Sequence, residues 1–496
     1  MLTTSFQIDG LNWLMYKWTK NIPCILADEM GLGKTVQIVS FINALFTLHN
    51  QYPFMILAPS ITIGHWQDEF AKWAPEIVAV HYTGTKTDRT MIRDYEINGP
   101  KGSSRFRFHV LLANYEMMMN ESSLFRDIPF AALVCDEGHR LKNDESKTFR
   151  NLMNNIKVEH KVVLSGTPLQ NNMRELFNLM NFLDSKKWED PKDLASKFGI
   201  ENIKDDDTII PLIHDYLRPY FLRRTKKEVL TFLPPKAEIV VPISLSSVQK
   251  ELYKAVLSKN FQLLRSIGVQ EKGEKTAAPL KNILMELRKI CNHPYLASTT
   301  NMEPPDATAA DLHKLMVDAC GKFALLQPML RKLKDTGHRV LIFSQFKIAL
   351  DIIEDFLEGE GYKYQRIDGD TPTSTRHSMI TKFNEPGSED FVFLLTTRTG
   401  GTGINLTSAD TVIIYDSDWN PHQDIQAVAR VHRIGQTKPV LIYKLCTRDS
   451  IEESVLERST SKLVLDKIVV GAMKEEENIN TKELSSILKY GAKKLF

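Results

Sequence analysis

The sequence is 496 residues long, with 43% hydrophobic and 25% charged residues, the balance of a folded globular protein rather than a disordered or fibrous one. Lys and Arg total 63 against 61 for Asp and Glu, so the net charge of +2 offers no bulk attraction for nucleic acid, and any such site must be local. No apolar run reaches the ~18 residues that cross a bilayer, and the five scattered cysteines form no C-x-x-C pair, which argues against membrane, disulfide-stabilised and zinc-stabilised classes.

Short, continuous apolar runs alternate with helical patterns along the chain. Continuous rather than alternating hydrophobicity is typical of parallel strands that are covered on both faces. Strands that alternate with helices predict an α/β fold, and each half of the chain is long enough to bury a sheet of its own. The runs predicted to be strands are residues 24–27, 54–58, 110–113, 132–135 and 161–164 in the first half, and 339–343, 391–397, 411–416 and 440–445 in the second.

The connections between these elements are marked by proline, glycine and polar residues. Pro234 and Pro235 predict a hinge between the two halves, because consecutive prolines end regular structure. Residues 98–104 and 298–310 predict surface loops, and residues 480–491 predict a short amphipathic helix.

The first predicted strand leads into a glycine-rich loop and then into a helical pattern at residues 36–46. A strand, a glycine loop and a helix in this order turn backbone N–H groups and the helix N-terminus towards a bound phosphate. In such a loop Lys34 would hold the β- and γ-phosphates and Thr35 would ligate Mg²⁺. The usual pattern has glycine where this chain has Asp28, and the loop alone is also compatible with a plain glycine turn. The candidate nucleotide-binding residues are Asp28, Glu29, Met30, Gly31, Leu32, Gly33, Lys34 and Thr35.

A second candidate follows the predicted strand at residues 132–135, which runs directly into Asp136 and Glu137. A carboxylate at a strand end can hold the shell of a magnesium ion, and its neighbour can orient and deprotonate an attacking water. We therefore assign Asp136 to the metal and Glu137 to the water. The alternative is an acidic turn followed by a solvated histidine. The combination of the two carboxylates with the glycine loop makes that alternative less favourable and predicts an ATPase or a GTPase.

With these residues in place, the chain resembles the Swi/Snf-type ATPases of helicase superfamily two almost from end to end. The HRIGQ run at residues 432–436, with the motif order and spacing intact, is more specific than any single loop. The matching motifs are Q, Ia, II, III, IV, V and VI at residues 7–14, 58–66, 136–143, 165–172, 341–346, 396–406 and 426–436.

The resemblance implies two RecA-like lobes, each a mostly parallel sheet flanked by helices, with helical insertions. The implied domains are an ATP-binding lobe at 1–235, a C-terminal lobe at 236–470 with its core at about 320–465, and an extension at 471–496. The chain would then be the motor part of a longer protein. Within the family it is most similar to the chromodomain-helicase (CHD) remodellers and their Mi-two-like branch, on residues 222–233, 235–236, 291–295, 410–420 and 481–496.

The resemblance also implies roles for individual residues. Gln7 would contact adenine, and Arg430 and Arg433 would neutralise charge on the γ-phosphoryl group when the lobes close. Their spacing from Gln426 is compatible with one face of a continuous helix. The residues expected to couple hydrolysis to movement are Gly138, His139, Ser165, Gly166, Thr167, Gly401 and Gln426, and those expected to contact DNA are Ser344, Gln345, Thr396, Arg398 and Trp419.

This chain departs little from the family pattern. Thr399 and Thr402 stand where motif V usually has Ala and Leu, and Gly138 replaces the commoner Ala of motif II. The implied function is an ATP- and Mg²⁺-dependent double-stranded DNA translocase that moves nucleosomes without separating strands. The implied setting is the nucleus, a monomeric motor, nucleosomal histones as partners and a repressive complex that contains a histone deacetylase.

Two other classes of function stay open on the residues alone. A non-catalytic DNA or histone scaffold would tolerate loss of Lys34, Glu137 or Arg433, all of which are present. A strand-separating helicase or a repair translocase would share the motifs but would need a separation pin or different accessory segments. The basic run at residues 223–227 is compatible with a nuclear import signal, although such a run inside a domain is more typical of a solvated face.

Overall fold

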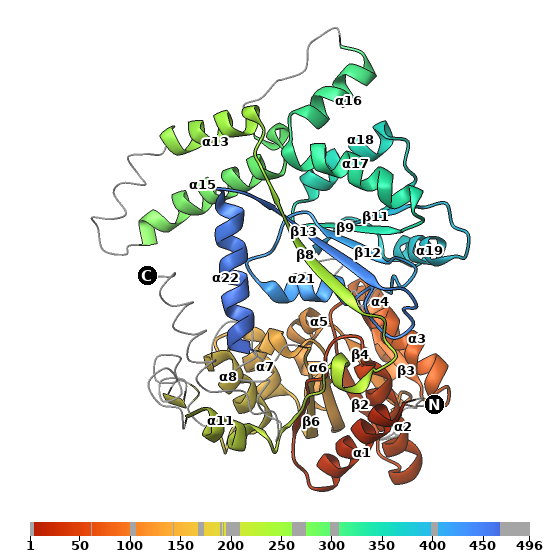
Figure 1. The fold of residues 1–496 in the computed structure, drawn as a ribbon. Helices are drawn as coiled ribbons and strands as arrows, with labels where there is room; N and C mark the ends of the chain where they lie inside the picture. The colour runs from red at the N-terminus through yellow and green to blue at the C-terminus, as the bar shows by residue number, and fades with distance from the viewer. Residues whose placement is uncertain are drawn as a thin grey trace. The chain divides into compact units, whose positions relative to one another are not determined.

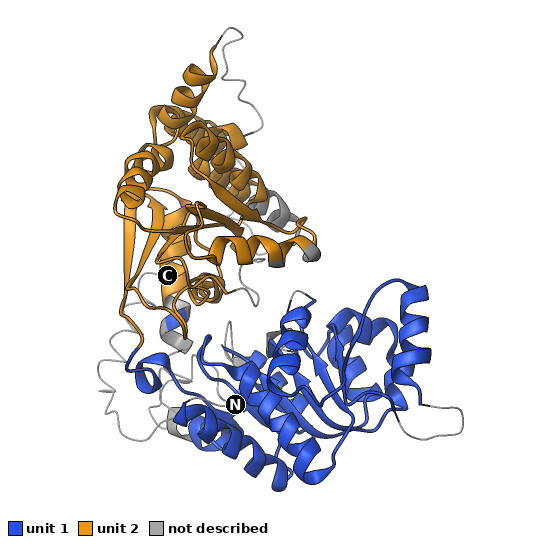
Figure 2. Cartoon of the chain, turned by 90° about the vertical axis from the view of Figure 1, so that its right-hand side faces the viewer, with its two compact units in different colours: residues 1–232, 462–496 blue, residues 233–461 orange. Residues whose placement is uncertain are grey.

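The computed structural model describes residues 4–60, 62–99, 106–141, 143–166, 173–188, 191, 193–194, 209–259, 274–297, 307–397 and 405–466. The chain forms two compact units, one of residues 1–232 with 462–496 and one of residues 233–461 (Figure 2). Each unit contains an all-parallel sheet flanked by helices, which confirms the predicted α/β class with two RecA-like lobes.

The first unit is built on a seven-stranded parallel sheet in the order β3-β4-β2-β5-β6-β1-β7. Its strands are β1 (Cys24–Leu26), β2 (Phe54–Leu57), β3 (Ala79–Tyr82), β4 (Val110–Ala113), β5 (Phe130–Cys135), β6 (Val158–Leu164) and β7 (Phe221–Leu222). Its helices are α1 (Ser5–Thr19), α2 (Lys34–His49), α3 (Ile63–Trp73), α4 (Lys86–Ile92), η1 (Arg93–Ile97), α5 (Tyr115–Asn120), α6 (Ser122–Arg126), η2 (Gly138–Leu141), α7 (Lys147–Asn155), α8 (Met173–Leu183), α11 (Ile209–Leu217) and α12 (Lys226–Val229).

Successive residues of the central strands enter two different cores, because side chains alternate between the faces of a sheet. Cys24 and Leu26 belong to the core that α1, α2 and α3 cover. Ile25 lies between them in sequence and belongs to the core that α5, α7, α8 and α11 cover. Burial on both faces explains the continuous apolar runs from which these strands were predicted.

The second unit contains a six-stranded parallel sheet in the order β10-β11-β9-β12-β13-β8. Its strands are β8 (Lys236–Ile243), β9 (Val340–Ser344), β10 (Tyr364–Ile367), β11 (Val392–Thr396), β12 (Thr411–Ile414) and β13 (Val440–Thr447). Its helices are α13 (Ser247–Lys259), α15 (Glu274–Asn292), η3 (Pro294–Leu296), α16 (Ala309–Asp318), α17 (Gly321–Asp335), α18 (Lys347–Gly359), α19 (Thr373–Asn384), α21 (Pro421–Val428) and α22 (Ile451–Asp466). Figure 1 shows α13 beside α15, away from the sheet.

The nine predicted strands all occur, whereas four further strands, β3, β7, β8 and β10, were not predicted. The eight residues of β8 are mostly exposed, since it pairs only with β13 at one edge of its sheet. Its apolar run, residues 239–241, is short and stops at Pro242, and a proline within such a run is typical of an edge strand or a loop. Most of the predicted loops and the whole predicted C-terminal helix lie outside the described residues. Among the helices described here, none is both long and apolar enough to cross a membrane.

Candidate active site

The loop between β1 and α2 has the geometry of a phosphate cradle. Gly31 and Gly33 adopt positive φ angles of +87° and +78°, which residues with a Cβ atom rarely adopt. α2 begins at Lys34, and the Lys34 Nζ atom donates a 2.7 Å hydrogen bond to the carbonyl oxygen of Asp28. The loop is therefore closed around its own lysine, at the N-terminal end of a helix of 16 residues.

Gln7 of α1 lies directly against this loop. Its amide Nε2 donates to the carbonyl oxygen of Leu32 at 3.3 Å. A Cβ atom on Gly33 would lie 2.6 Å from the same Nε2, so the glycine leaves room for this contact. The structure thus brings the predicted adenine-contacting residue to the predicted phosphate loop.

Asp136 and Glu137 follow directly after β5, at the same edge of the sheet as the loop after β1, because all strands are parallel. The Asp136 carboxylate accepts the indole N–H of Trp66 at 3.0 Å and the backbone N–H of Glu137 at 2.9 Å. The Tyr115 hydroxyl donates to the Asp136 carbonyl oxygen at 2.6 Å. Glu137 itself has a φ of +53°, so a sharp turn separates the directions of the two carboxylates.

The charges of the two segments act on one another. Burial lowers the pKa of Lys34, and the carboxylates of Asp28, Glu137 and Asp136 oppose that change. Burial and the charge of Glu137 raise the pKa of Asp136 to about 6, against the Trp66 hydrogen bond and the charge of Lys34. Lys34, Asp136 and Glu137 therefore form one electrostatic cluster. Clusters of groups with perturbed pKa values are typical of functional sites.

This cluster fits a magnesium ion. The charge of Glu137 disfavours the ionised form of its half-buried neighbour Asp136, and a divalent cation would remove that cost. Each Asp136 oxygen accepts one protein hydrogen bond and retains a second acceptor site for a metal-bound water. Magnesium usually binds through one or two protein groups plus phosphates and waters, which matches Asp136 with Thr35.

The raised pKa of Asp136 predicts an acidic limit to catalysis. Below about pH 6 the metal-free carboxylate gains a proton and loses its charge, so turnover at sub-saturating Mg²⁺ should fall by about tenfold per pH unit there and level off above. Trp66→Phe removes a hydrogen bond that stabilises the ionised form, so it should move the fall to higher pH. Steady-state turnover from pH 5 to 8 tests this, and an identical acidic limb in both proteins would exclude Asp136 as the titrating group.

The carboxylate of Asp28, where many phosphate loops have glycine, is fully buried and binds protein groups. It accepts hydrogen bonds from Arg224, at 2.9 Å from the guanidinium Nε, and from Gln37 at 3.3 Å. Arg224 also donates to Gln37 Oε1 at 3.0 Å and to the carbonyl oxygen of Phe6. Asp28 thus joins the phosphate loop to α1, to α2 and to the segment after β7.

The expectation of a solvated face for residues 223–227 is wrong for two of the five. Arg224 and Lys226 are 8% and 6% exposed. The backbone N–H of Lys226 donates to Glu29 Oε2 at 2.7 Å, and the N–H of Glu29 donates to the Arg224 carbonyl oxygen at 2.9 Å. Arg224 and Lys226 thus pair with Asp28 and Glu29 of the phosphate loop, almost 200 residues away in the sequence. Local charge patterning does not reveal such a pairing.

Breaking this buried pair should destabilise the first unit strongly. Arg224→Met leaves Asp28 charged and without its main partner, at a cost of about 3–5 kcal/mol in the free energy of unfolding. Urea unfolding followed by circular dichroism measures this cost. The control is Lys227→Met, which removes an equal charge from an exposed neighbour. Equal shifts for the two variants would contradict the assigned role of the pair.

The coupling residues of the first unit that the structure describes lie close to this cluster. Gly138 begins η2, where a Cβ atom would lie 2.3 Å from Val163 Cγ1. The Ser165 N–H donates to the Leu26 carbonyl oxygen at 3.2 Å, and a Cβ on Gly166 would lie 2.6 Å from Met30 Cγ. Motif III thus packs directly on the phosphate loop. His139 lies on η2, while Thr167 and Gly401 lie outside the described residues.

In the second unit, the expectation that Gln426, Arg430 and Arg433 share one continuous helix is wrong. Gln426 is buried on α21, but α21 ends at Val428 and both arginines follow in turns. The Gln436 side-chain amide holds the backbone after α21 in a non-helical path, because it donates to the carbonyl oxygens of Ala409 at 2.8 Å and Val431 at 3.3 Å. Side-chain capture of backbone oxygens competes with helix continuation.

Three of the predicted DNA contacts occur at adjacent strand ends. Ser344 and Thr396 are paired in register at the ends of β9 and β11 and are 0% and 9% exposed. Gln345 follows Ser344 and is half-buried. Trp419 lies before α21 with the Arg458 guanidinium 5.5 Å from its ring centroid. Arg398 lies outside the described residues, as do Thr399 and Thr402.

Comparison with known proteins agrees with this arrangement. Residues 6–296 match the SNF2-related domain and residues 321–435 match the helicase conserved C-terminal domain. The chain therefore belongs to the SNF2-related ATPase family, with a helicase C-terminal domain, as the motif resemblance implied.

Within the family, the chain is similar to chromatin-remodelling factors of the CHD type over almost its whole length. It is 44% identical over 99% of its length to the CHD3-type chromatin-remodeling factor PICKLE of Arabidopsis thaliana, of which it covers 36%. It is 45% identical to the chromodomain-helicase-DNA-binding protein 3 homolog of Caenorhabditis elegans, covering 28%, and 44% identical to the chromatin remodeling factor mit1 of Schizosaccharomyces pombe, covering 34%. The chain thus spans about a third of the length of these relatives.

Proposed function

We propose that this chain is the motor of a nucleosome remodeller, a DNA-dependent ATPase that translocates along double-stranded DNA and thereby slides or spaces nucleosomes. The observation that carries the proposal is the electrostatic cluster of Lys34, Asp136 and Glu137 at the carboxyl edge of a parallel sheet. Such a cluster next to a glycine loop is suited to phosphoryl transfer to water.

The proposed chemistry uses few residues. Gln7 contacts the adenine, the loop N–H groups and Lys34 hold the phosphates, and Glu137 orients a water molecule and takes its proton. The water oxygen bonds to the γ-phosphorus while the bond to the bridging oxygen breaks, which yields ADP and inorganic phosphate. A magnesium ion held by Thr35 and Asp136 would supply charge neutralisation on the phosphate oxygens.

The second unit is assigned the transition-state arginines and the DNA contacts. Arg430 and Arg433 would neutralise charge that develops on the γ-phosphoryl group, an effect worth about 10³–10⁵ in rate in related NTPases. Polar groups at the ends of β9 and β11 would contact the DNA backbone. Contacts of this kind carry affinity without sequence information, so binding should be salt-dependent and sequence-tolerant.

Substrate and setting are proposed from the relatives, whose names describe chromatin remodelling and chromodomain-helicase-DNA-binding proteins. We assign nucleosomes and double-stranded DNA as substrates, the nucleus as location and a monomeric motor. Association with a repressive, histone-deacetylase-containing complex belongs to the same proposal. The proposed boundaries are a lobe at 1–235, a lobe at 236–470 and an extension at 471–496.

Translocation without unwinding can be tested with two DNA substrates. Displacement of a triplex-forming third strand reports movement along intact duplex, and release of one arm of a forked duplex reports strand separation. The proposal predicts ATP-dependent displacement of the third strand and no release from the fork. Release from the fork would favour the helicase alternative, and failure of both with a folded, ATP-hydrolysing protein would refute translocation.

A further inference from the structure

A single buried carboxylate joins the ends of two strands in the second unit. Asp416 follows β12 and is 1% exposed. Its two oxygens accept the backbone N–H of Gln345, at 3.1 and 3.3 Å, and a hydrogen bond from Ser344 also stabilises its ionised form. The side-chain amide of Gln345 reaches the carbonyl oxygen of Asp416 at 3.5 Å. The directions of both Ser344 and Gln345 therefore depend on Asp416.

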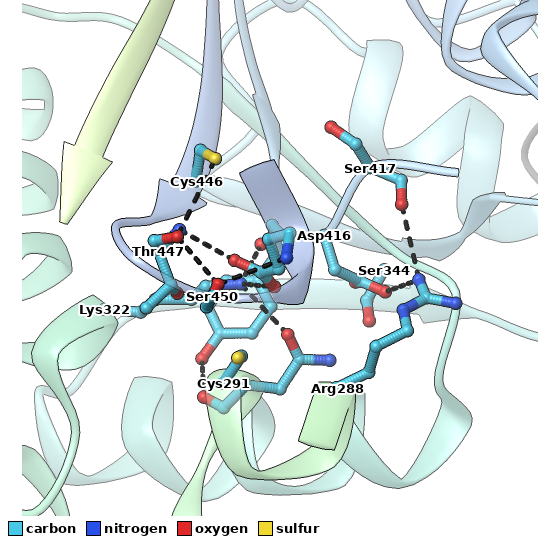
Figure 3. A network of polar contacts seen from close by, with 12 residues as sticks. Arg288, Cys291, Lys322, Ser344, Asp416, Ser417, Cys446, Thr447 and Ser450 are labelled. Atoms are coloured by element: carbon cyan, nitrogen blue, oxygen red, sulfur yellow. Dashed lines mark hydrogen bonds and ion pairs between the residues drawn. The ribbon is translucent and has the colours of Figure 1, made fainter. Parts of the chain in front are cut away.

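A helix outside the sheet holds this junction through one arginine. Arg288 of α15 places its guanidinium 3.6 Å from Asp416 Oδ2 and donates to the carbonyl oxygen of Ser417 at 3.3 Å. Its guanidinium carbon also lies 5.1 Å from the ring centroid of Phe346. Figure 3 shows the Arg288 side chain running from α15 to Asp416 and Ser417. One planar cation thus contacts both segments, residues 344–346 and 416–417.

One turn beyond Arg288, the C-terminal end of the same helix is anchored by a second buried cation. Lys322 at the start of α17 is 1% exposed and donates to Asn292 Oδ1 at 3.0 Å, the Tyr415 carbonyl oxygen at 2.7 Å and Glu452 Oε1 at 2.7 Å. The Tyr415 hydroxyl donates to the Asn292 carbonyl oxygen at 2.6 Å. These contacts fix the C-terminal end of α15 to the segment after β12 and to α22, and therefore give Arg288 a rigid base.

From this geometry we propose that Arg288 is a positioning residue for DNA engagement, which aligns the polar groups of Gln345 through Asp416, Ser417 and Phe346. Ser344 is fully buried and belongs to the support beneath Gln345. The inference rests on the proposed function, because it needs Gln345 to face DNA. Arg288 is itself buried, with 7% of its side chain exposed, so it acts through these residues and not on a phosphate. α15 thereby becomes part of the DNA-binding apparatus without touching DNA.

The test measures ATP turnover against duplex concentration for the parent chain and for Arg288→Met. Misaligned contacts should raise the duplex concentration for half-maximal stimulation about tenfold, the effect of losing one or two ordinary hydrogen bonds. Turnover at saturating duplex should return to the parent value. Damage to folding alone would instead lower turnover at every duplex concentration and leave the half-saturating value unchanged.

Salt dependence separates positioning from direct contact. Loss of a cation that binds a phosphate reduces the slope of log affinity against log salt by about 0.9, whereas loss of a positioning residue leaves that slope unchanged. Lys289→Met is the matched control, because it removes an equal charge from the next residue of α15, which is not buried. It should behave as the parent.

Two further variants protect the test against a folding failure. Arg288→Lys keeps the charge but loses the planar fork, and should give an intermediate half-saturating concentration. Arg288→Met with Asp416→Asn leaves no uncompensated buried charge, and should add little to the effect of the stronger single variant because both act on one junction.

The outcomes are distinct. Parent-like half-saturation in Arg288→Met and Arg288→Lys, with the parent stimulated by duplex, would overturn this inference and leave the proposed function standing. A reduced salt slope in Arg288→Met would also overturn it, in favour of direct phosphate contact. A parent that duplex does not stimulate would refute the proposed function, and this inference with it.

Discussion

Replacing Lys34 by alanine is expected to reduce ATP turnover by about 10²–10³-fold or more, the cost of removing a group aimed at charge that develops during reaction. In the folded protein the Lys34 ammonium is tied to the Asp28 carbonyl oxygen and faces the charges of Asp136 and Glu137. Its loss removes the phosphate-binding cation and raises the pKa of Asp136 further above about 6. Both effects act against hydrolysis.

Steady-state phosphate release measures this loss, with unfolding monitored in parallel. The control is Lys72→Ala, which removes an exposed lysine whose ammonium stacks on Trp73 at 4.7 Å. Turnover should stay near the parent value in that variant. Parent-like turnover in Lys34→Ala would place the nucleotide site elsewhere.

Glu137→Gln should bind ATP with nearly unchanged affinity and hydrolyse it about 10²–10⁴-fold more slowly, the usual contribution of a positioned general base. Glutamine keeps the size of the side chain and removes the proton acceptor. It also removes the charge that raises the pKa of Asp136, so metal binding should be preserved or strengthened. The variant should therefore accumulate bound ATP.

Fluorescent-nucleotide titration and single-turnover hydrolysis separate the two steps. Glu76→Gln, an isosteric change at an exposed position, serves as the control. Loss of ATP binding in Glu137→Gln would show that the carboxylate holds the nucleotide or the metal, and unchanged hydrolysis would remove it from the catalytic group.

The central strands of both sheets were predictable because a strand that is buried on both faces has a continuous run of apolar residues. The ends of β1 and β5 carried the loop and the carboxylates as expected, since parallel strands present their carboxyl ends at one edge. The edge strand β8 was not predicted, because its apolar run at residues 239–241 is short, follows charged residues and stops at Pro242.

The contacts that support the site were less visible in the sequence. Arg224 and Asp28 are 196 residues apart, and each alone resembles an ordinary charged residue. Nothing in the local sequence marks Trp66, whose indole N–H holds Asp136. The end of α21 at Val428 depends on Gln436, whose amide binds the carbonyl oxygens of Thr407 and Ala409 in the segment before β12. Partners brought together only by the tertiary fold leave no local signal.

The most direct measurement is ATP turnover by this chain alone, with naked duplex DNA and with nucleosomes, at fixed Mg²⁺ and two salt concentrations. A DNA-coupled motor predicts low turnover alone and strong stimulation by duplex that weakens as salt rises. The ratio between nucleosomes and duplex shows whether histones act on this part of the protein. Turnover that is the same with and without DNA, or absent in all conditions from a folded protein, would contradict the account.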